Sequence, residues 1–250
     1  MILRAVRMGQ GGTPILLLHG LFGAASNWGR VQRHLSEARQ VLAFDLRNHG
    51  ASPHDKVFDY PSMAADVFET LDHLGIASVA VLGHSMGGKV AMQMALAAPA
   101  RVTRLVVADI APVTYPVHFE AMAAAMLALP LTSGLTRAGA SAALEQTAPD
   151  PAIRAFLLQN LRFGDVPSWR VALPEIAAGL PAIASWTATG VYDGPVLVLR
   201  GERSDYVLPE HRALFRALFP SARFATLRGA GHWLHADAPE AFVQTVGGFL

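Results

Sequence analysis

One short stretch of the chain carries a residue that could attack a substrate covalently. Gly83-His84-Ser85-Met86-Gly87 fits the pattern Gly-x-Ser-x-Gly, and it lies between an apolar run at 79–82 and a helix-forming run at 90–97. This succession is the context in which a serine sits exposed on a sharp turn between a strand and a helix. Glycines flank the turn because Cβ atoms there would collide. The pattern predicts Ser85 as a nucleophile at a helix N-terminus, where developing negative charge is favoured.

A serine hydroxyl is a weak nucleophile, so it needs a base to take its proton and an acid to orient that base. His232 follows the last predicted strand and precedes the last predicted helix, in a loop with Gly229 and Gly231 that could bring its imidazole to Ser85. We therefore predict His232 as the base. His235 is the second choice, and we interpret it as structural.

Two acidic residues follow predicted strands and could orient His232. Asp109 ends the apolar run 104–108, and Asp205 follows the apolar run 195–200. In parallel sheets, active residues gather at the carboxyl ends of the strands, and both aspartates lie there. The residues alone leave both as candidates.

Hydrolysis of an acyl group also needs backbone N–H donors for the developing oxyanion, each contributing about 2.7–4 kcal/mol. We expect the amide of Met86, which follows the nucleophile, and an amide from the turn after the run 14–18. Leu21 is the first choice in that turn and Phe22 the second. His19 and His84, which flank these turns, are expected to hold loop geometry rather than to transfer protons.

The composition excludes several classes of function. The 250 residues are 52% hydrophobic and 16% charged, with a net charge of +1 and no basic cluster, so we expect neither a nucleic-acid partner nor a membrane partner. The absence of cysteine removes disulfides, thiolate nucleophiles and cysteine-ligated metals, and we expect no metal site. The N-terminus lacks the apolar run of a signal peptide, so we expect a cytoplasmic protein.

Apolar runs alternate with helical patterns along most of the chain. The predicted strands lie at 2–7, 14–18, 40–45, 79–82, 104–110, 195–200 and 223–227, and the predicted helices at 27–37, 61–75, 90–97, 209–219 and 239–250. This alternation predicts an α/β fold with about seven strands in a mostly parallel sheet and helices on both faces.

The alternation is interrupted in the middle of the chain. We expect a core of residues 1–111 and 194–250 and a helical cap of residues 112–193, with helices at 119–129, 139–145 and 151–161 and no strand. Phe119, Met122 and Trp169 of the cap, with Phe22 of the core, are candidates to contact an apolar substrate, and packing of the cap onto the core is the alternative role. Arg162 and Arg170 could meet an anionic part of a substrate.

Five stretches carry a resemblance to a known family. They are His19-Gly20-Leu21-Phe22-Gly23, Asp45-Leu46-Arg47-Asn48-His49-Gly50-Ala51-Ser52-Pro53, Gly83-His84-Ser85-Met86-Gly87-Gly88-Lys89, Asp109-Ile110-Ala111-Pro112-Val113 and Gly229-Ala230-Gly231-His232-Trp233. Over its full length the chain resembles the α/β-hydrolases, and more closely the small bacterial YbfF-type esterases and their mitochondrial abhydrolase relatives.

The resemblance implies hydrolysis of carboxylic esters or acyl thioesters by Ser85 and His232 without a cofactor. It favours Asp109 as the acid, because an acid before Ile-Ala-Pro belongs to the pattern of the subfamily. In the broader superfamily the acid follows the strand at 196–200, where this chain has Ser204 with Asp205 one residue on. Asp205 is therefore kept as the alternative acid, and the resemblance implies that Ser204 can sit near the histidine and assist it.

Three other functions are alternatives to ester hydrolysis. The same residues could serve carbon–carbon bond hydrolysis or perhydrolysis, or the chain could be a non-catalytic binder of a small ligand. Retention of a complete set of serine, histidine and acid argues against a binder. We expect a small ester or thioester as the partner and a monomer or small homo-oligomer.

Overall fold

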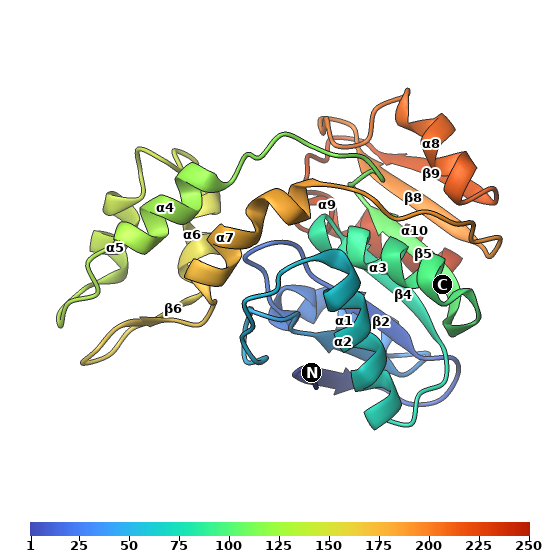
Figure 1. Cartoon of the computed structure of the whole chain (residues 1–250), viewed down its shortest axis with the longest axis horizontal. Helices are drawn as coiled ribbons and strands as arrows, with labels where there is room; N and C mark the ends of the chain where they lie inside the picture. Colours follow the sequence, from blue (N-terminus) through green and yellow to red (C-terminus); the bar gives the residue numbers. More distant parts are fainter.

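The computed structural model describes all residues from 1 to 250 and contains one large sheet with helices on both faces (Figure 1). Its strand order is β1-β3-β2-β4-β5-β8-β9, and only β1 runs antiparallel to its neighbour. The strands are β1 Ala5–Met8, β2 Ile15–Leu18, β3 Val41–Phe44, β4 Val79–His84, β5 Val102–Ala108, β8 Val196–Gly201 and β9 Ala222–Leu227. The predicted seven-stranded, mostly parallel sheet is confirmed.

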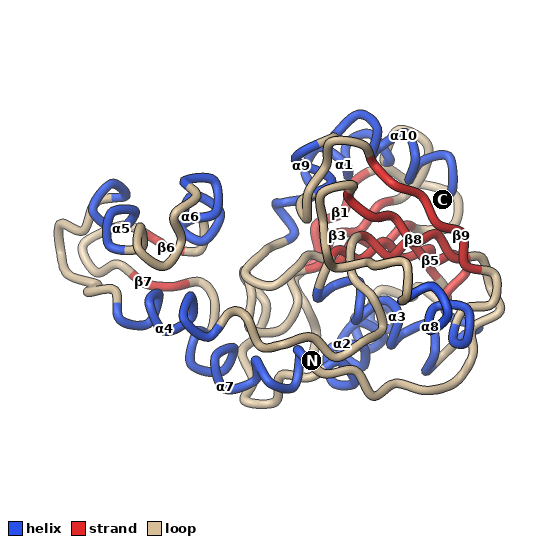
Figure 2. The backbone as a smooth tube through the Cα atoms, turned by 90° about the horizontal axis from the view of Figure 1, so that it is seen from above, coloured by secondary structure: helices blue, strands red, loops and turns tan.

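Helices cover the sheet in two layers. The helices that join or follow these strands are α1 Gly29–Leu35, α2 Tyr60–His73, α3 Met86–Ala97, α8 His211–Leu218, α9 Leu234–Asp237 and α10 Pro239–Phe249, with short 3-10 turns at Ala25–Trp28 and Pro99–Arg101. Figure 2 shows α1, α9 and α10 on one face and α2, α3 and α8 on the other.

The hydrophobic core is divided by the sheet into two clusters. Along β2, Leu16 and Leu18 belong to the cluster under α2 and α3, whereas Ile15 and Leu17 belong to the cluster under α1 and α10. All four side chains are almost completely buried. A parallel strand that is covered on both faces requires such an uninterrupted apolar run, which is the pattern that predicted it.

Most of the segment 112–193 between β5 and β8 lies to one side of the sheet (Figures 1 and 2). It contains α4 Glu120–Ala128, α5 Arg137–Ala143, α6 Pro151–Leu158, β6 Leu161–Arg162, β7 Ser168–Trp169 and α7 Leu173–Ala184. Two expectations were wrong here, because the segment holds a two-stranded ribbon, β6–β7, and a fourth helix, α7. Pro174 occupies the first turn of α7, where a missing N–H costs no hydrogen bond, and Pro181 lies inside the helix.

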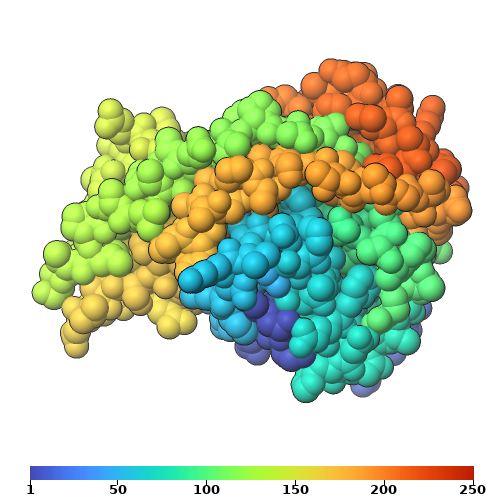
Figure 3. Space-filling view, viewed as in Figure 1, coloured from blue at the N-terminus to red at the C-terminus, as the bar shows by residue number.

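The two ends of this segment run beside each other back to the core. The Tyr115 amide donates to the Ala184 carbonyl at 2.9 Å, and the Trp186 amide donates to Thr114 Oγ1 at 3.1 Å. Figure 3 shows the outgoing and returning stretches side by side across the surface of the core. None of the helices is long and apolar enough to cross a bilayer.

Candidate active site

Ser85 lies on a strained turn between β4 and α3. Its backbone has φ 53° and ψ −122°, a combination that L-residues rarely adopt. A Cβ on Gly83 would lie 2.1 Å from the Gly87 carbonyl oxygen, and one on Gly87 would lie 2.4 Å from the Leu18 carbonyl oxygen. The tight approach to backbone atoms explains why both positions are glycine, and it fixes Ser85 at the carboxyl edge of the sheet.

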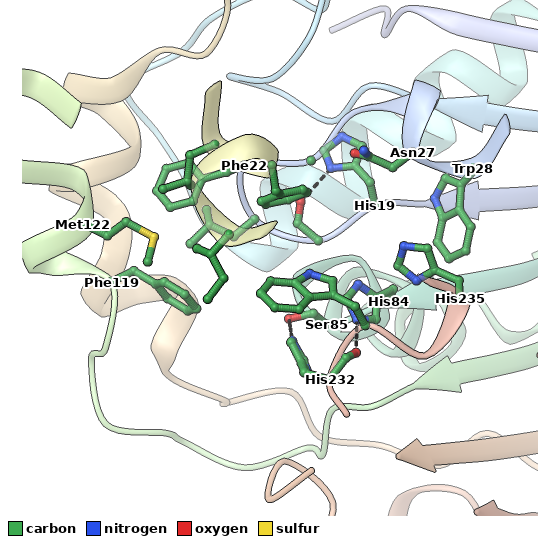
Figure 4. Close-up of a pocket in the computed structure, with 17 residues that line it drawn as sticks. His19, Phe22, Asn27, Trp28, His84, Ser85, Phe119, Met122, His232 and His235 are labelled. Atoms are coloured by element: carbon green, nitrogen blue, oxygen red, sulfur yellow. Dashed lines mark hydrogen bonds between the residues drawn. The ribbon is translucent and has the colours of Figure 1, made fainter. Parts of the chain in front are cut away.

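The structure brings Ser85, His232 and Asp109 into one chain of hydrogen bonds. Ser85 Oγ lies 3.1 Å from His232 Nε2, and His232 Nδ1 lies 2.8 Å from Asp109 Oδ2. The carboxylate only accepts, so Nδ1 of a neutral His232 carries the proton and Nε2 is left to accept from the serine hydroxyl. His232 is supplied by the loop between β9 and α9, and Figure 4 shows its ring turned to Ser85.

Asp109 is completely buried and has every carboxylate oxygen engaged. The amide of Gly201 donates to Oδ1 at 2.9 Å, while His232 Nδ1 and the hydroxyl of Ser204 both donate to Oδ2. Its own φ of 55° turns the side chain toward the loop of His232. These three donors hold the carboxylate in one orientation.

The alternative acid does not reach this arrangement. Asp205 is exposed and makes no hydrogen bond, although it is adjacent to Ser204. Asp205 lies on the surface, because its neighbour Ser204 takes the inward position after β8. The Ser204 hydroxyl donates to Asp109 Oδ2, the same oxygen that accepts from His232, so Ser204 lies near the histidine.

Two aromatic rings support His232 from its sides. The ring of Tyr206 is stacked on the imidazole, with centroids 4.0 Å apart and planes 19° from parallel. His84 Nε2 lies 2.8 Å from the His232 carbonyl oxygen, so it carries a proton and donates. Burial lowers the pKa of His84 well below its usual value, and a neutral His84 thus anchors the backbone of the His232 loop.

The amides of Leu21 and Met86 make no hydrogen bond in the structure, whereas the amide of Phe22 donates to His49 Nε2 at 3.1 Å. Phe22, the second choice for an oxyanion donor, is therefore already engaged. Free amides at Leu21 and Met86 are available to a substrate oxygen, since both residues line a cavity together with Ser85.

Two buried histidines hold the turn that carries Leu21. His19 accepts from the Leu46 amide at 2.9 Å and donates from Nδ1 to the Gly20 carbonyl, and His49 donates from Nδ1 to the Arg47 carbonyl. Burial lowers the pKa of His19 to about 4 and that of His49 to about 3, so both rings are neutral near pH 7. His19 lies in the turn where it was expected, whereas no role was expected for His49.

Two cavities meet at Ser85, Leu21 and Phe119. The first encloses about 100 Å³ and is lined by His232, Trp233, Phe22, Met122 and Phe156, among others (Figure 4). The second encloses about 50 Å³ and is lined by Met86, Lys89, Tyr60, Tyr115 and Tyr206, among others. The other side chains of the second cavity are mostly apolar, whereas the first cavity is also lined by His19, Asn27, His84 and His235.

Of the four predicted substrate contacts, Trp169 does not line either cavity. It lies on β7, where it pairs with Leu161 of β6, and this pairing holds it within the inserted segment. Phe22, Phe119 and Met122 do line the first cavity, with Phe22 and Phe119 in edge-to-face contact at 6.4 Å.

The inserted segment is fastened to the turn that carries Leu21. Asn160 is buried, and its Nδ2 donates to the Phe22 carbonyl at 2.7 Å. Beside it, Asn27 Nδ2 donates to Gln159 Oε1 at 3.0 Å. The wall of the first cavity is thus bonded directly to the candidate oxyanion turn.

A family model described as alpha/beta hydrolase fold matches residues 13–239. The chain is 38% identical to esterase YbfF of Escherichia coli K12, over 95% of this chain and 93% of that protein. It is 40% identical to the sn-1-specific diacylglycerol lipase ABHD11 of Mus musculus, over 94% of this chain and 80% of that protein. Among solved structures it resembles a marine microorganism esterase with a TM-score of 0.96 and 35% identity, covering 100% of this chain and 99% of the other.

Proposed function

Because the chain belongs to the α/β-hydrolase fold family and is a carboxylesterase-type hydrolase, we propose that it cleaves esters through an acyl-enzyme intermediate on Ser85. The observation that carries this proposal is the continuous hydrogen-bond chain from Ser85 through His232 to buried Asp109, beside two unpaired amides.

In the first half of the reaction, Ser85 Oγ attacks the acyl carbon while His232 Nε2 takes the hydroxyl proton. The electron pair of the carbonyl moves to oxygen, and the amides of Leu21 and Met86 donate to the oxyanion. Asp109 stabilises the imidazolium and keeps its orientation. Collapse of the intermediate expels the alcohol, which takes the proton from His232 Nε2.

The second half repeats these steps with water. His232 Nε2 takes a proton from the water as its oxygen attacks the acyl carbon, and the same two amides hold the oxyanion. Ser85 Oγ then leaves and recovers the proton from His232. The products are a carboxylic acid, an alcohol and the starting form of the enzyme, with no cofactor consumed.

The two cavities suggest where each half of the ester binds. The leaving oxygen must lie next to His232 Nε2, because that atom supplies its proton, and His232 lines only the first cavity. We therefore assign the alcohol part to the first cavity and the acyl part to the second. In this proposal residues 112–193 act as a cap, since Phe119, Met122 and Phe156 close the first cavity.

A groove beside the first cavity favours acyl thioesters of a phosphate-bearing thiol as a second class of substrate. Arg4, Arg33, Arg162 and Arg170 line this groove of about 490 Å³, and none of them pairs with a carboxylate. The groove is also lined by residues 24–26, and the neighbouring residues Gly23 and Asn27 line the first cavity, so the two lie close together. Phosphates are good ligands for arginine guanidinium groups.

The test compares p-nitrophenyl butanoate with butanoyl thioesters of coenzyme A and of pantetheine. We expect hydrolysis of the p-nitrophenyl ester by the wild type and its loss, by about a thousandfold or more, in Ser85→Ala. Retained activity in this variant would reject the mechanism. A lower KM for the coenzyme A thioester than for the pantetheine thioester would support the thioester proposal, and equal values would reject it.

A further inference from the structure

Lys89 is a buried cation beside the nucleophile that the proposed reaction does not use. It lies on α3, four residues after Ser85, and its side chain is among the most buried in the protein, at 1% exposure. Ser85 immediately precedes the first residue of α3, and Lys89 lies in the first turn of that helix. Both line the second cavity.

The protein partners of the Lys89 ammonium are all uncharged. Nζ donates to the carbonyls of Ala184 at 3.1 Å and Ser185 at 3.0 Å, at the carboxyl end of α7. It also lies 5.4 Å and 5.0 Å from the ring centroids of Tyr60 and Tyr115. In its charged form Lys89 has three N–H groups, so one of them has no hydrogen-bond acceptor in the protein.

A buried ammonium without a counter-ion is costly, and proteins ordinarily pair buried charges. No carboxylate lies within 4.0 Å of Lys89, and burial lowers its pKa to about 7, so near pH 7 the side chain is only partly charged. The helix end and the two tyrosine rings offset a part of this cost. The free N–H donor and the absence of a carboxylate partner together make Lys89 a candidate binding group for an anion in the second cavity. A bound anion would favour the charged form.

The position of Lys89 decides which part of a substrate would carry that anion. This step rests on the proposed function, in which the second cavity receives the acyl group. Met86 supplies an oxyanion amide to the same cavity, so an acyl chain bonded to Ser85 would enter it with its far end directed away from the catalytic groups. The cavity encloses only about 50 Å³, which suits a short chain.

We propose that Lys89 binds a carboxylate at the far end of a short acyl group, so that the preferred substrates are half-esters or half-thioesters of short dicarboxylic acids. The ammonium donates its free N–H to the carboxylate, and the surrounding apolar walls strengthen this charge-assisted hydrogen bond. A neutral acyl chain of the same length leaves Lys89 without a counter-ion.

The experiment compares matched pairs of substrates that differ only in this group. Monoethyl glutarate is paired with ethyl pentanoate, and monoethyl succinate with ethyl butanoate, with released ethanol as the readout. For the wild type we expect a kcat/KM at least about tenfold higher for the carboxylate member of at least one pair. A wild-type preference for the neutral member of both pairs would overturn the proposal. Hydrolysis of neither member would instead count against the proposed esterase function.

Two variants separate recognition from structural support. Lys89→Met is expected to lower the ratio of kcat/KM between carboxylate and neutral ester by about tenfold or more, whereas the exposed Lys56→Met is expected to leave this ratio unchanged. An equal loss for both esters in Lys89→Met would assign Lys89 a purely structural role and overturn the proposal.

A binding measurement tests the proposal without catalysis. Calorimetry with monoethyl glutarate on Ser85→Ala should give a Kd at least about tenfold lower than that of ethyl pentanoate, and Ser85→Ala combined with Lys89→Gln should remove this difference. Equal binding of the two esters to Ser85→Ala would overturn the proposal even if the esterase activity itself is absent.

Discussion

Replacement of Asp109 by asparagine tests which acid orients the histidine. Asp109 accepts three hydrogen bonds in a fully buried position, two of them at Oδ2, from His232 and Ser204. If the asparagine oxygen keeps the bond from the Gly201 amide, its NH₂ group faces His232 Nδ1. That group can only donate, so it stabilises the tautomer with the proton on Nε2, which cannot accept the proton of Ser85.

The expected loss follows from this change of tautomer. We expect kcat for p-nitrophenyl butanoate to fall by about 10⁴ in Asp109→Asn, which corresponds to about 5.5 kcal/mol in the activation free energy. Replacing the carboxylate also weakens charge-assisted bonds, so the free energy of unfolding should fall by about 1–3 kcal/mol. Circular dichroism and denaturant unfolding would show that the variant is folded under the conditions of the assay.

Asp205→Asn is the matched control, because it makes the same chemical change in an exposed residue without hydrogen bonds. Its activity should stay within about twofold of the wild type. Loss of activity in Asp205→Asn together with retained activity in Asp109→Asn would refute the assignment of Asp109 and the reasoning from burial that supports it.

Two further predictions concern the backbone that positions the site. His19 and His49 have native pKa values of about 4 and about 3, below the 6.5 of an unfolded chain, so between pH 6.5 and 4 the unfolded state binds more protons. The free energy of unfolding should therefore fall on acidification by about 1.4 kcal/mol per pH unit for each ring. The His49→Gln variant should show a smaller dependence of this free energy on pH in urea titrations at pH 7, 6 and 5. An unchanged dependence would contradict the prediction. Gly87→Ala should lower the free energy of unfolding by about 3 kcal/mol, because the added Cβ would lie 2.4 Å from the Leu18 carbonyl oxygen. Gly248→Ala is the control: Gly248 has open space around it in α10, so this change should leave the free energy of unfolding unchanged or raise it. Equal effects of the two changes would refute the steric argument.

The sheet was predictable because its pattern is local. Each parallel strand is a short apolar run, such as 14–18 or 195–200, and these runs are separated by helices with regular apolar spacing. The inserted segment was less predictable. The prolines at 174 and 181 suggested breaks where α7 forms, and β6 and β7 have only two residues each, too few for a periodic signal.

The candidate site divides in the same way. Ser85 and His232 stand in short motifs between predicted elements, so their types and order identify them without coordinates. The choice between Asp109 and Asp205 depends on which side chain turns inward after its strand, which is a property of the loop fold. The proximity of Lys89 to Ser85 could have been expected, because the two residues are only four positions apart in the sequence. That Lys89 is buried without a counter-ion is visible only in the folded structure, where the end of α7 packs against it.

The measurement that tests the central claim most directly is covalent labelling with a fluorophosphonate, read by intact mass and peptide mapping. The account predicts one adduct per chain, located on Ser85. It predicts no adduct in Ser85→Ala and labelling slowed by about a thousandfold in His232→Ala, because the hydroxyl then lacks its base. Labelling of another residue, or an unchanged rate without His232, would contradict the account.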